Sequence, residues 1–507
     1  MNNPSEAVMP APSRRVVWLS IAAMAVLYAS TLVRFPWPGD PAELTVAAAT
    51  LGVAHPTGYP LYILLGHIVI RLFWWASPAL VMSAFSASCM LLALWVFAVV
   101  CRHLGVGPAS TAIGILTLGS THSLWENATW AEIYSLQVLV VSLVIVARLT
   151  RGESSSRFRR LAPWFLAGLA AVSHMTAVLL VPGLVVWAFL ESGFHAKAPR
   201  VRTTLEAFGA WIAGASAFGL LLLLDRPGVA NYIDQYALEH PDARFGQPLA
   251  RFWWLVSASQ YQAIEEPLAK FFSLQLVSDA LNELRLLTSH APVLMIGGAA
   301  GLVMVLRGAS RRESRTAFAA FAVVTLCLTF VYLSGYSGGY AEPEFFSAGF
   351  VLLAFGLAQA LDGAGSLRRM MRWAAFALAV LGIAAGFPAL NRADGAIYYK
   401  ENRRLLASIE PNAVVFSTWG NSTLLWYAQY VEGLQTEVLV ANAHPSNWAS
   451  IARRVPGRPM YFESVPLGAP PRLFSPHLHF FRLRGPTAAP NQPAHHDRRP
   501  LADEPTR

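Results

Sequence analysis

The chain has 507 residues, of which 55% are hydrophobic and only 13% are charged, and its mean hydropathy is +0.44. Soluble proteins carry about a quarter charged residues, so a chain this apolar must be dissolved in lipid. This composition excludes a disordered chain, a nucleic-acid-binding module and a disulfide-linked secreted domain, and we attribute the net charge of +9 to membrane topology. The three cysteines lie in or at the ends of apolar runs and have no metal-ligand spacing.

The first apolar run extends from Val16 to Val33 and follows Arg14 and Arg15. Its small residues Ala29 and Ser30 would suit a cleavage site, but the run is long enough to span a bilayer. We therefore expect an uncleaved first transmembrane helix preceded by a cytoplasmic N-terminal segment, residues 1–15.

More apolar runs follow along the chain, and arginine-rich loops between them set the expected orientation, because such loops stay in the cytoplasm. If the run 58–76 crossed the membrane, the loop from Arg148 to Arg160 would fall outside. We therefore expect 58–76 to lie along the membrane surface, with about eleven spans, the N-terminus inside and the C-terminus outside. The remaining predicted spans are 81–101, 108–124, 129–148, 161–177, 178–190, 204–224, 291–306, 316–334, 345–363 and 373–390.

This topology predicts a transmembrane domain over 16–390 with two long external loops, 34–80 and 225–290. Strand-like and helical patterns then alternate, which predicts a small external α/β domain over 391–484. The segment 485–507 is rich in Pro, His and Arg and is expected to be disordered. The predicted fold class is an all-α polytopic membrane protein with a small C-terminal α/β domain.

The segment Gly39-Asp40-Pro41-Ala42-Glu43 opens an Ala-rich helix that ends near Gly52. One interpretation is purely structural: Asp40 caps the helix, Glu43 completes a capping box, and Gly52 terminates it. The other is catalytic, because Asp40 and Glu43 share one helical face where a carboxylate can act as a general base.

The turn His55-Pro56-Thr57-Gly58-Tyr59-Pro60 follows, with two prolines and a glycine that fix the backbone. His55 is expected to stand close to the acidic helix. His67 and Arg71 are four residues apart, so they share one face of the next helix. They either anchor that helix at the membrane surface or bind a lipid phosphate.

Other polar residues lie near expected outer helix ends. Glu132 and Glu344 precede helices, where acidic residues usually interact with the helix dipole. His174, in Ser173-His174-Met175-Thr176, is either a packed polar residue or part of a site. No P-loop, dinucleotide-binding, zinc-protease or nucleophile-elbow motif occurs in the sequence.

The run from Gly39 to Glu43 and on from Leu51 through His55 to Tyr62 resembles the hallmark of a bacterial multipass membrane family. That family, long catalogued as a domain of unknown function, is related to an animal transmembrane protein O-mannosyltransferase. The segment 131–134 and the stretch 168–182 are similar to its later blocks. The resemblance is good over roughly residues 16–190, looser to about 390 and weak beyond it.

The resemblance implies a GT-C glycosyltransferase, which transfers a sugar from a polyprenyl-phosphate donor to an acceptor hydroxyl with inversion. It implies a carboxylate base, Asp40 or Glu43, and no nucleic-acid partner. The acceptor would be a protein or a glycan, the location a bacterial inner membrane, and the use of a divalent metal stays open. A flippase for the lipid-linked sugar and a non-catalytic scaffold are the alternatives. The implied substrate-binding residues are His55, Tyr59, His67, Arg71, Glu132 and His174.

Overall fold

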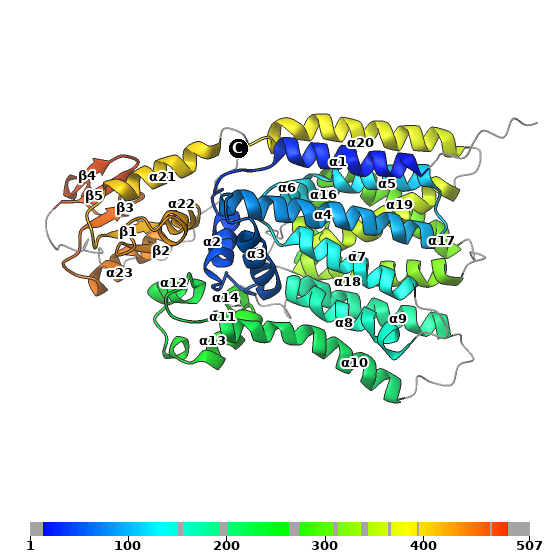
Figure 1. Ribbon diagram of the computed structural model, residues 1–507, viewed down its shortest axis with the longest axis horizontal. Coiled ribbons are helices and arrows are strands. Elements are labelled where there is room, and N and C mark those ends of the chain that lie inside the picture. Colours follow the sequence, from blue (N-terminus) through cyan, green and yellow to red (C-terminus); the bar gives the residue numbers. More distant parts are fainter. Residues whose placement is uncertain are drawn as a thin grey trace, which may run out of the picture.

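A bundle of helices with a small α/β unit at one end makes up the computed structural model (Figure 1). The predicted tail 485–507, most of the N-terminal segment, and Glu265 and Glu266 of the second external loop lie outside the described residues. The structure describes residues 14–150, 156–192, 201–262, 274–307, 313–335, 343–363, 367–392, 395–466 and 469–484.

The long elements of the bundle are apolar helices separated by short connections. Two of them begin with a proline, Pro78 and Pro108, at a position where the missing N–H costs nothing. These elements are α1 (Arg15–Thr31), α4 (Pro78–His103), α5 (Pro108–Gly119), α7 (Tyr134–Leu149), α8 (Arg157–Ser173), α9 (Leu180–Ser192), α10 (Val201–Ala215), α17 (Ala299–Arg307), α18 (Glu313–Gly335), α19 (Ser347–Gly363) and α20 (Arg368–Leu390).

Shorter helices connect these elements or cover one end of the bundle. They are α2 (Asp40–Thr50), α3 (Pro60–Leu72), α6 (His122–Thr129), α11 (Leu221–Leu224), α12 (Tyr232–Glu239), α13 (Pro248–Val256), α14 (Ser259–Gln262) and α16 (Leu274–His290), with the 3₁₀ turns η1 (Met175–Leu179), η2 (Ser216–Leu220), η3 (Ala243–Gly246) and η6 (Pro343–Phe346) and the π turn η4 (Leu294–Gly298).

Among the described residues, five helices are long and apolar enough to cross a membrane, or up to seven if each of two bent helix pairs forms one span. The bent pairs are α6 with α7, at 112°, and α16 with η4 and α17, at 108°. Shorter apolar helices, including α1 and α5, add to this set. The chain is thus a multipass membrane protein, while the number of about eleven crossings stays a prediction.

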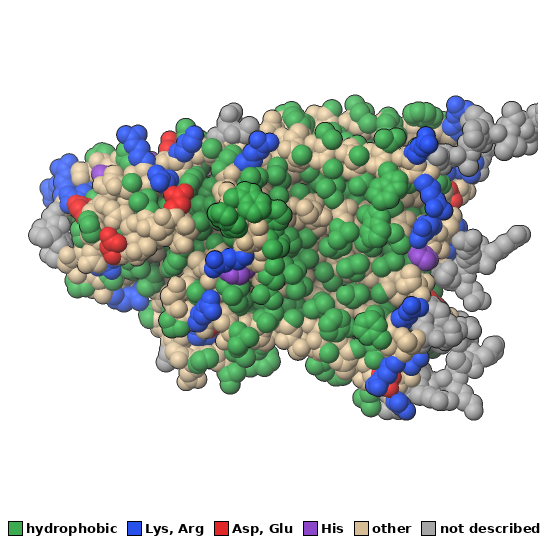
Figure 2. Space-filling model, in the orientation of Figure 1, with side chains coloured by type: hydrophobic (Ala, Val, Ile, Leu, Met, Phe, Trp, Pro, Cys, Tyr) green, Lys and Arg blue, Asp and Glu red, His purple; other side chains and the backbone are tan. Residues whose placement is uncertain are grey.

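Apolar side chains cover the face of the bundle drawn in Figure 2, and Lys and Arg side chains gather at the end far from the α/β unit as well as on that unit. At that end, the guanidinium of Arg315 donates hydrogen bonds to the carbonyls of Leu104 and Gly105, at 2.5 and 3.0 Å. Asp362 accepts one from the amide of Gly107 at 3.1 Å and also pairs with Arg372. Arginines therefore fasten the helix connections at this end.

Helices α2 and α3 lie at the opposite end of the bundle, beside the α/β unit (Figure 1). Four consecutive apolar side chains, Leu72 to Trp75, are 47–78% exposed just after α3 and next to the exposed Arg71. Aromatic and basic residues of this kind favour the boundary between lipid and water. That the segment 58–76 lies along the membrane surface stays a prediction.

The C-terminal unit is a five-stranded sheet with the strand order β2-β1-β3-β5-β4. Strands β2 and β3 pair with β1 in parallel, whereas β5 pairs antiparallel with β3 and β4. Its elements are α21 (Ala396–Ser408), β1 (Val414–Ser417), α22 (Trp419–Trp426), the π turn η9 (Tyr427–Val431), β2 (Leu439–Asn442), η10 (Pro445–Asn447), α23 (Trp448–Arg454), β3 (Met460–Phe462), η11 (Pro471–Leu473), β4 (Phe474–His477) and β5 (Phe480–Leu483).

The α/β unit and helix α2 share one hydrophobic core. Ala42 and Val46 of α2 are buried in a cluster with Leu424 and Leu425 of α22 and with Ala230 from the second external loop. Since apolar burial contributes about 25 cal/mol per Å², this shared core holds the unit against the first external loop. The C-terminal unit is thus packed onto the loop that carries the acidic pair.

The end of α2 differs from the prediction. Leu51 adopts the left-handed conformation, with φ of 56°, and terminates the helix in the role that the sequence suggested for Gly52. Gly52 is instead needed for a close approach, because a Cβ there would meet the carbonyl oxygen of Ala230 at 2.0 Å. Beside it, the amide of Val53 donates to Ala230 O at 3.0 Å, and the amide of Tyr232 donates to Val53 O at 3.0 Å.

Gly52→Ala is expected to lower the melting temperature of the detergent-solubilised protein by several degrees. The added methyl group would separate the two loops, and such overpacking costs about 1–3 kcal/mol. Gly209→Ala is the control, because a Cβ at Gly209 in α10 meets nothing within 4 Å. Equal melting temperatures for the two variants would contradict the close approach at Gly52.

Candidate active site

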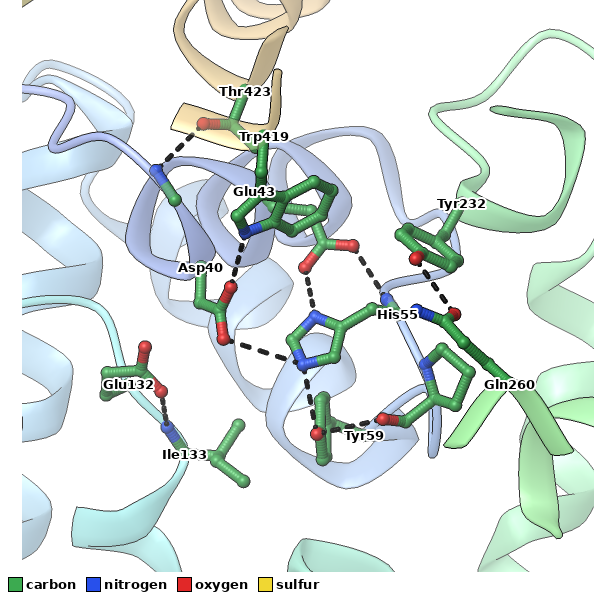
Figure 3. A network of polar contacts seen from close by, with 12 residues as sticks. Asp40, Glu43, His55, Tyr59, Glu132, Ile133, Tyr232, Gln260, Trp419 and Thr423 are labelled. Atoms are coloured by element: carbon green, nitrogen blue, oxygen red, sulfur yellow. Dashed lines mark hydrogen bonds and ion pairs between the residues drawn. The ribbon is translucent and has the colours of Figure 1, made fainter. Parts of the chain in front are cut away.

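A buried pair, Glu43 on α2 and His55 in the following loop, forms the centre of a polar network (Figure 3). The carboxylate of Glu43 accepts two hydrogen bonds from His55, one from the ring Nδ1 at 2.6 Å and one from the backbone amide at 2.7 Å. The loop after α2 is therefore folded back so that His55 stands over the acidic face of the helix, as the sequence led us to expect.

Asp40 lies on the other side of the imidazole. Its Oδ2 is 3.6 Å from Nε2 of His55, and its Oδ1 accepts a hydrogen bond from the indole Nε1 of Trp419 at 2.7 Å. The Asp40 side chain is 42% exposed, whereas that of Glu43 is 6% exposed. The two carboxylates thus differ in their environment, and only Asp40 is accessible to a substrate hydroxyl.

Neither carboxylate serves as a helix cap, so the structural interpretation of this motif is wrong. Gly39 is the N-cap residue and α2 has no side-chain capping bond. A capping box would direct Glu43 toward the backbone at the start of the helix. Instead Glu43 points to His55 and Asp40 to Trp419, so both acids make their contacts away from the start of their own helix (Figure 3).

Hydrogen-bond geometry indicates that His55 carries a proton on both ring nitrogens. Nδ1 faces a carboxylate oxygen, and Nε2 is 3.1 Å from the hydroxyl of Tyr59. That hydroxyl donates its one proton to the carbonyl of Pro56 at 3.1 Å, so its oxygen accepts from Nε2. The site therefore holds an imidazolium between two carboxylates.

Electrostatics agrees with this assignment. Burial alone would lower the pKa of His55, but the charges of Glu43 and Asp40 and the bond to Glu43 outweigh burial and raise it to about 9. Burial also raises the pKa of Glu43, against the opposing effect of the His55 charge. Both shifts mean that the folded protein holds the shared proton more tightly than the unfolded chain does.

Tyr59 connects the network to His174 and to an aromatic cluster. Its ring stacks on His174 with a centroid distance of 6.5 Å, and Tyr134 and Phe345 lie 5.3 and 5.0 Å from the same imidazole. Nδ1 of His174 is 2.8 Å from the hydroxyl of Thr176, which fixes the ring. The structure thus brings the predicted residues His55, Tyr59 and His174 together.

Glu132 lies in the loop before α7, on the Asp40 side of the network (Figure 3). It is buried, and its carboxylate accepts a hydrogen bond from the amide of Ile133 at 3.3 Å. Ser86 bonds to both backbone groups of Glu132 and fixes the loop. Asp40 and Glu344 act electrostatically on its carboxylate, so Glu132 belongs to the acidic surroundings of Asp40.

His67 and Arg71 lie outside this network. Nδ1 of His67 bonds to the carbonyl of Ala48 at 2.8 Å, which ties α3 to the end of α2 that is distant from Asp40. Arg71 donates to Nε2 of His67 at 3.5 Å and is exposed. His67 thus holds α3 against α2, and both residues lie apart from the hydrogen bonds of His55.

Two residues of the site were missed in the sequence. Trp419 of α22 bonds to Asp40 from 379 positions away, and its ring lies 6.0 Å from that of His55. Tyr232 of the second external loop lies 6.2 Å from His55 and 5.6 Å from Trp419. Neither residue stands in a motif, so no local signal marks them. Across the described residues, no group of three or more His, Cys, Asp or Glu side chains could hold a metal ion.

The melting temperature is expected to fall as pH rises from about 6.5, the ordinary pKa of His, through the folded-state value of about 9. Because the pKa of His55 is higher in the folded protein than in the unfolded chain, its protonation stabilises the fold. This stabilisation is complete below the pKa of the unfolded chain and is lost as pH rises through the pKa of the folded protein. His55→Gln should flatten this part of the profile, whereas His67→Gln should keep the wild-type slope. The same slope in His55→Gln would show that His55 does not hold the proton.

Part of the chain is similar to a known protein family. Residues 40–196 match a family model described as the protein O-mannosyl-transferase TMEM260 N-terminal domain. Mouse (Mus musculus) protein O-mannosyl-transferase TMEM260 is 32% identical over 179 residues, which cover 33% of this chain. The chain spans only about a quarter, 24%, of the length of that relative.

Two solved structures share the fold over nearly the whole chain. The crystal structure of ArnT from Cupriavidus metallidurans bound to undecaprenyl phosphate has a TM-score of 0.58 and 12% identity, and the match covers 94% of this chain and all of ArnT. The apo structure has a TM-score of 0.57 and 14% identity, with 89% of this chain and 93% of ArnT covered. The predicted resemblance is confirmed over part of the chain: residues 40–196 match the TMEM260 N-terminal domain family, and the chain as a whole shares the fold of ArnT.

Proposed function

We propose that this protein is a membrane glycosyltransferase that moves a sugar from a polyprenyl-phosphate donor to an acceptor hydroxyl. The match of residues 40–196 to an O-mannosyltransferase family supports a mannosyl donor. The similarity in fold to ArnT bound to undecaprenyl phosphate supports a polyprenyl phosphate as the leaving group. A protein or a glycan would supply the hydroxyl.

The observation that carries the proposal is the pair of unequal carboxylates around His55. Glu43 is buried and committed to two hydrogen bonds with His55. Asp40 is 42% exposed and keeps one oxygen 3.6 Å from the imidazolium, beyond a close hydrogen bond. Of the two acids left open by the sequence, Asp40 is therefore the base, and Glu43 holds His55 in place.

In the proposed reaction, Asp40 takes the proton of the acceptor hydroxyl as the oxygen attacks the anomeric carbon. The bond from that carbon to the phosphate oxygen breaks on the opposite face, and the lipid phosphate leaves with the bonding electrons. One displacement inverts the anomeric centre and needs no covalent enzyme intermediate. The positive charge of His55 lies 3.6 Å from Asp40 and offsets negative charge at the site during the transfer.

The remaining predicted residues surround this centre at different distances. Tyr59, Glu132 and His174 would line the site beside Asp40, because they contact the same network or act on it electrostatically. His67 and Arg71 would contact the lipid phosphate or neighbouring headgroups from the outer surface of α3, since Arg71 is exposed beside apolar side chains.

The proposal includes an orientation: the N-terminus in the cytoplasm and the C-terminal unit outside a bacterial inner membrane. Its support is the distribution of charge, because Lys and Arg gather at the end of the bundle far from the α/β unit (Figure 2). Positively charged loops stay in the cytoplasm during insertion. The site at Asp40 would then face the outer side, together with the α/β unit.

Asp40→Asn is expected to reduce sugar transfer by roughly 10²–10⁴-fold, the usual contribution of a general base. Asn has the same shape and still accepts the hydrogen bond from Trp419, so the fold should be kept. The measurement is the transfer of labelled mannose from undecaprenyl phosphate mannose by the purified protein to acceptor peptides and glycans. Asp234→Asn, at a 59% exposed carboxylate of the second external loop, is the control.

Glu43→Gln should lose less activity than Asp40→Asn and melt at a lower temperature, because it disturbs the buried pair. Wild-type transfer rates in both variants would overturn the assignment of a carboxylate base. Movement of intact lipid-linked mannose between leaflets of a vesicle, without a mannosylated product, would replace the transferase with a flippase.

A further inference from the structure

We propose that the C-terminal α/β unit completes the active site, with Trp419 as the residue that positions the catalytic carboxylate of Asp40. This inference rests on the proposed function. It adds a role for the C-terminal unit, which lies outside residues 40–196, the segment that matches the family. Trp419 acts through Asp40 and is therefore a positioning residue.

Two hydrogen bonds join α22 to the start of α2 (Figure 3). The indole Nε1 of Trp419 donates to Oδ1 of Asp40 at 2.7 Å, and the hydroxyl of Thr423 accepts from the amide of Gly39 at 3.0 Å. The two bonds hold the first residue of α2 and its N-cap from the same side. One carboxylate oxygen of Asp40 is thereby fixed, and the other is left for the acceptor hydroxyl.

The sheet fixes the position of Trp419. Helix α22 begins directly after β1, at the carboxyl end of a parallel strand, where open α/β sheets commonly place functional residues. Glu463, next to the end of β3, accepts hydrogen bonds from the amide and the hydroxyl of Thr418 at 2.6–3.0 Å. The residue before Trp419 is therefore held by the neighbouring strand, so the indole is aimed from a rigid support.

The surroundings of the indole point to the same role. Its ring packs edge-on against His55 at 6.0 Å and against Tyr232 at 5.6 Å. Its own helix is buried in the core shared with Ala42 and Val46 of α2. Trp419 thus joins the three segments that meet at the site: the first external loop, the second external loop and the C-terminal unit.

Trp426 offers a matched control within the same helix. Its ring lies 5.8 Å from that of Trp419, and it is 4% exposed. Its indole nitrogen is buried and has no hydrogen-bond partner. Trp426→Phe therefore removes a neighbouring indole, more deeply buried than the half-buried Trp419, and leaves the bond to Asp40 in place.

Trp419→Phe is expected to lower kcat by roughly 10–100-fold, because the base loses its fixed position. KM for the lipid-linked sugar should stay within about twofold of wild type. A fall in kcat at nearly constant KM is the signature of a misplaced base, which a merely structural role would not produce. Trp426→Phe should leave both kcat and KM unchanged.

A Trp419→Phe variant with the same kcat as Trp426→Phe would overturn the inference. If Asp40→Asn is inactive in the same assay, only the role of Trp419 is contradicted. If Asp40→Asn is active, the assignment of Asp40 as the base is contradicted as well. A double-mutant cycle of melting temperatures with Asp40→Ala and Trp419→Phe tests the contact without substrate. The double variant should melt close to Trp419→Phe alone, and fully additive losses would contradict the bond.

Discussion

The buried contact between Glu43 and His55 is the interaction on which the site depends. A charged carboxylate at 6% exposure is tolerated only beside an opposite charge with good hydrogen bonds, and removing one partner of such a pair costs about 3–5 kcal/mol. His55 supplies both a ring N–H and a backbone N–H, so the loop 51–59 has to fold back over α2. With Glu43 committed in this way, Asp40 remains as the exposed carboxylate beside an imidazolium.

The rest of the outer end of the molecule is arranged around that loop. Gly52 allows the second external loop to pair with Val53, which brings Tyr232 to the imidazole. The C-terminal unit buries α2 in its own core and adds the indole of Trp419. Three segments far apart in the sequence therefore form one support around Asp40, which is what the proposed general base needs if its geometry is to be held.

Local patterns in the sequence predicted much of the fold. Apolar runs located the bundle helices, and alternating patterns located β1, α22, β2, α23 and β3, while the hairpin β4–β5 carried too little alternation to be noticed. The approach of Asp40, Glu43 and His55 also followed from helical spacing and a rigid turn. The use of those residues did not follow, because a capping box and a catalytic pair have the same spacing. Trp419 depends on tertiary packing across the whole chain, which no local pattern encodes.

The most direct test of whether sugar transfer takes place beside Asp40 is an experimental density map of the purified protein with undecaprenyl phosphate bound. The predicted position of the phosphate is the end of the bundle that carries the α/β unit, next to Asp40, Tyr59 and His174. A competing position exists between α8 and α10, where a pocket is lined by Arg157 and Arg202. Phosphate density in that pocket, with none beside Asp40, would contradict the account.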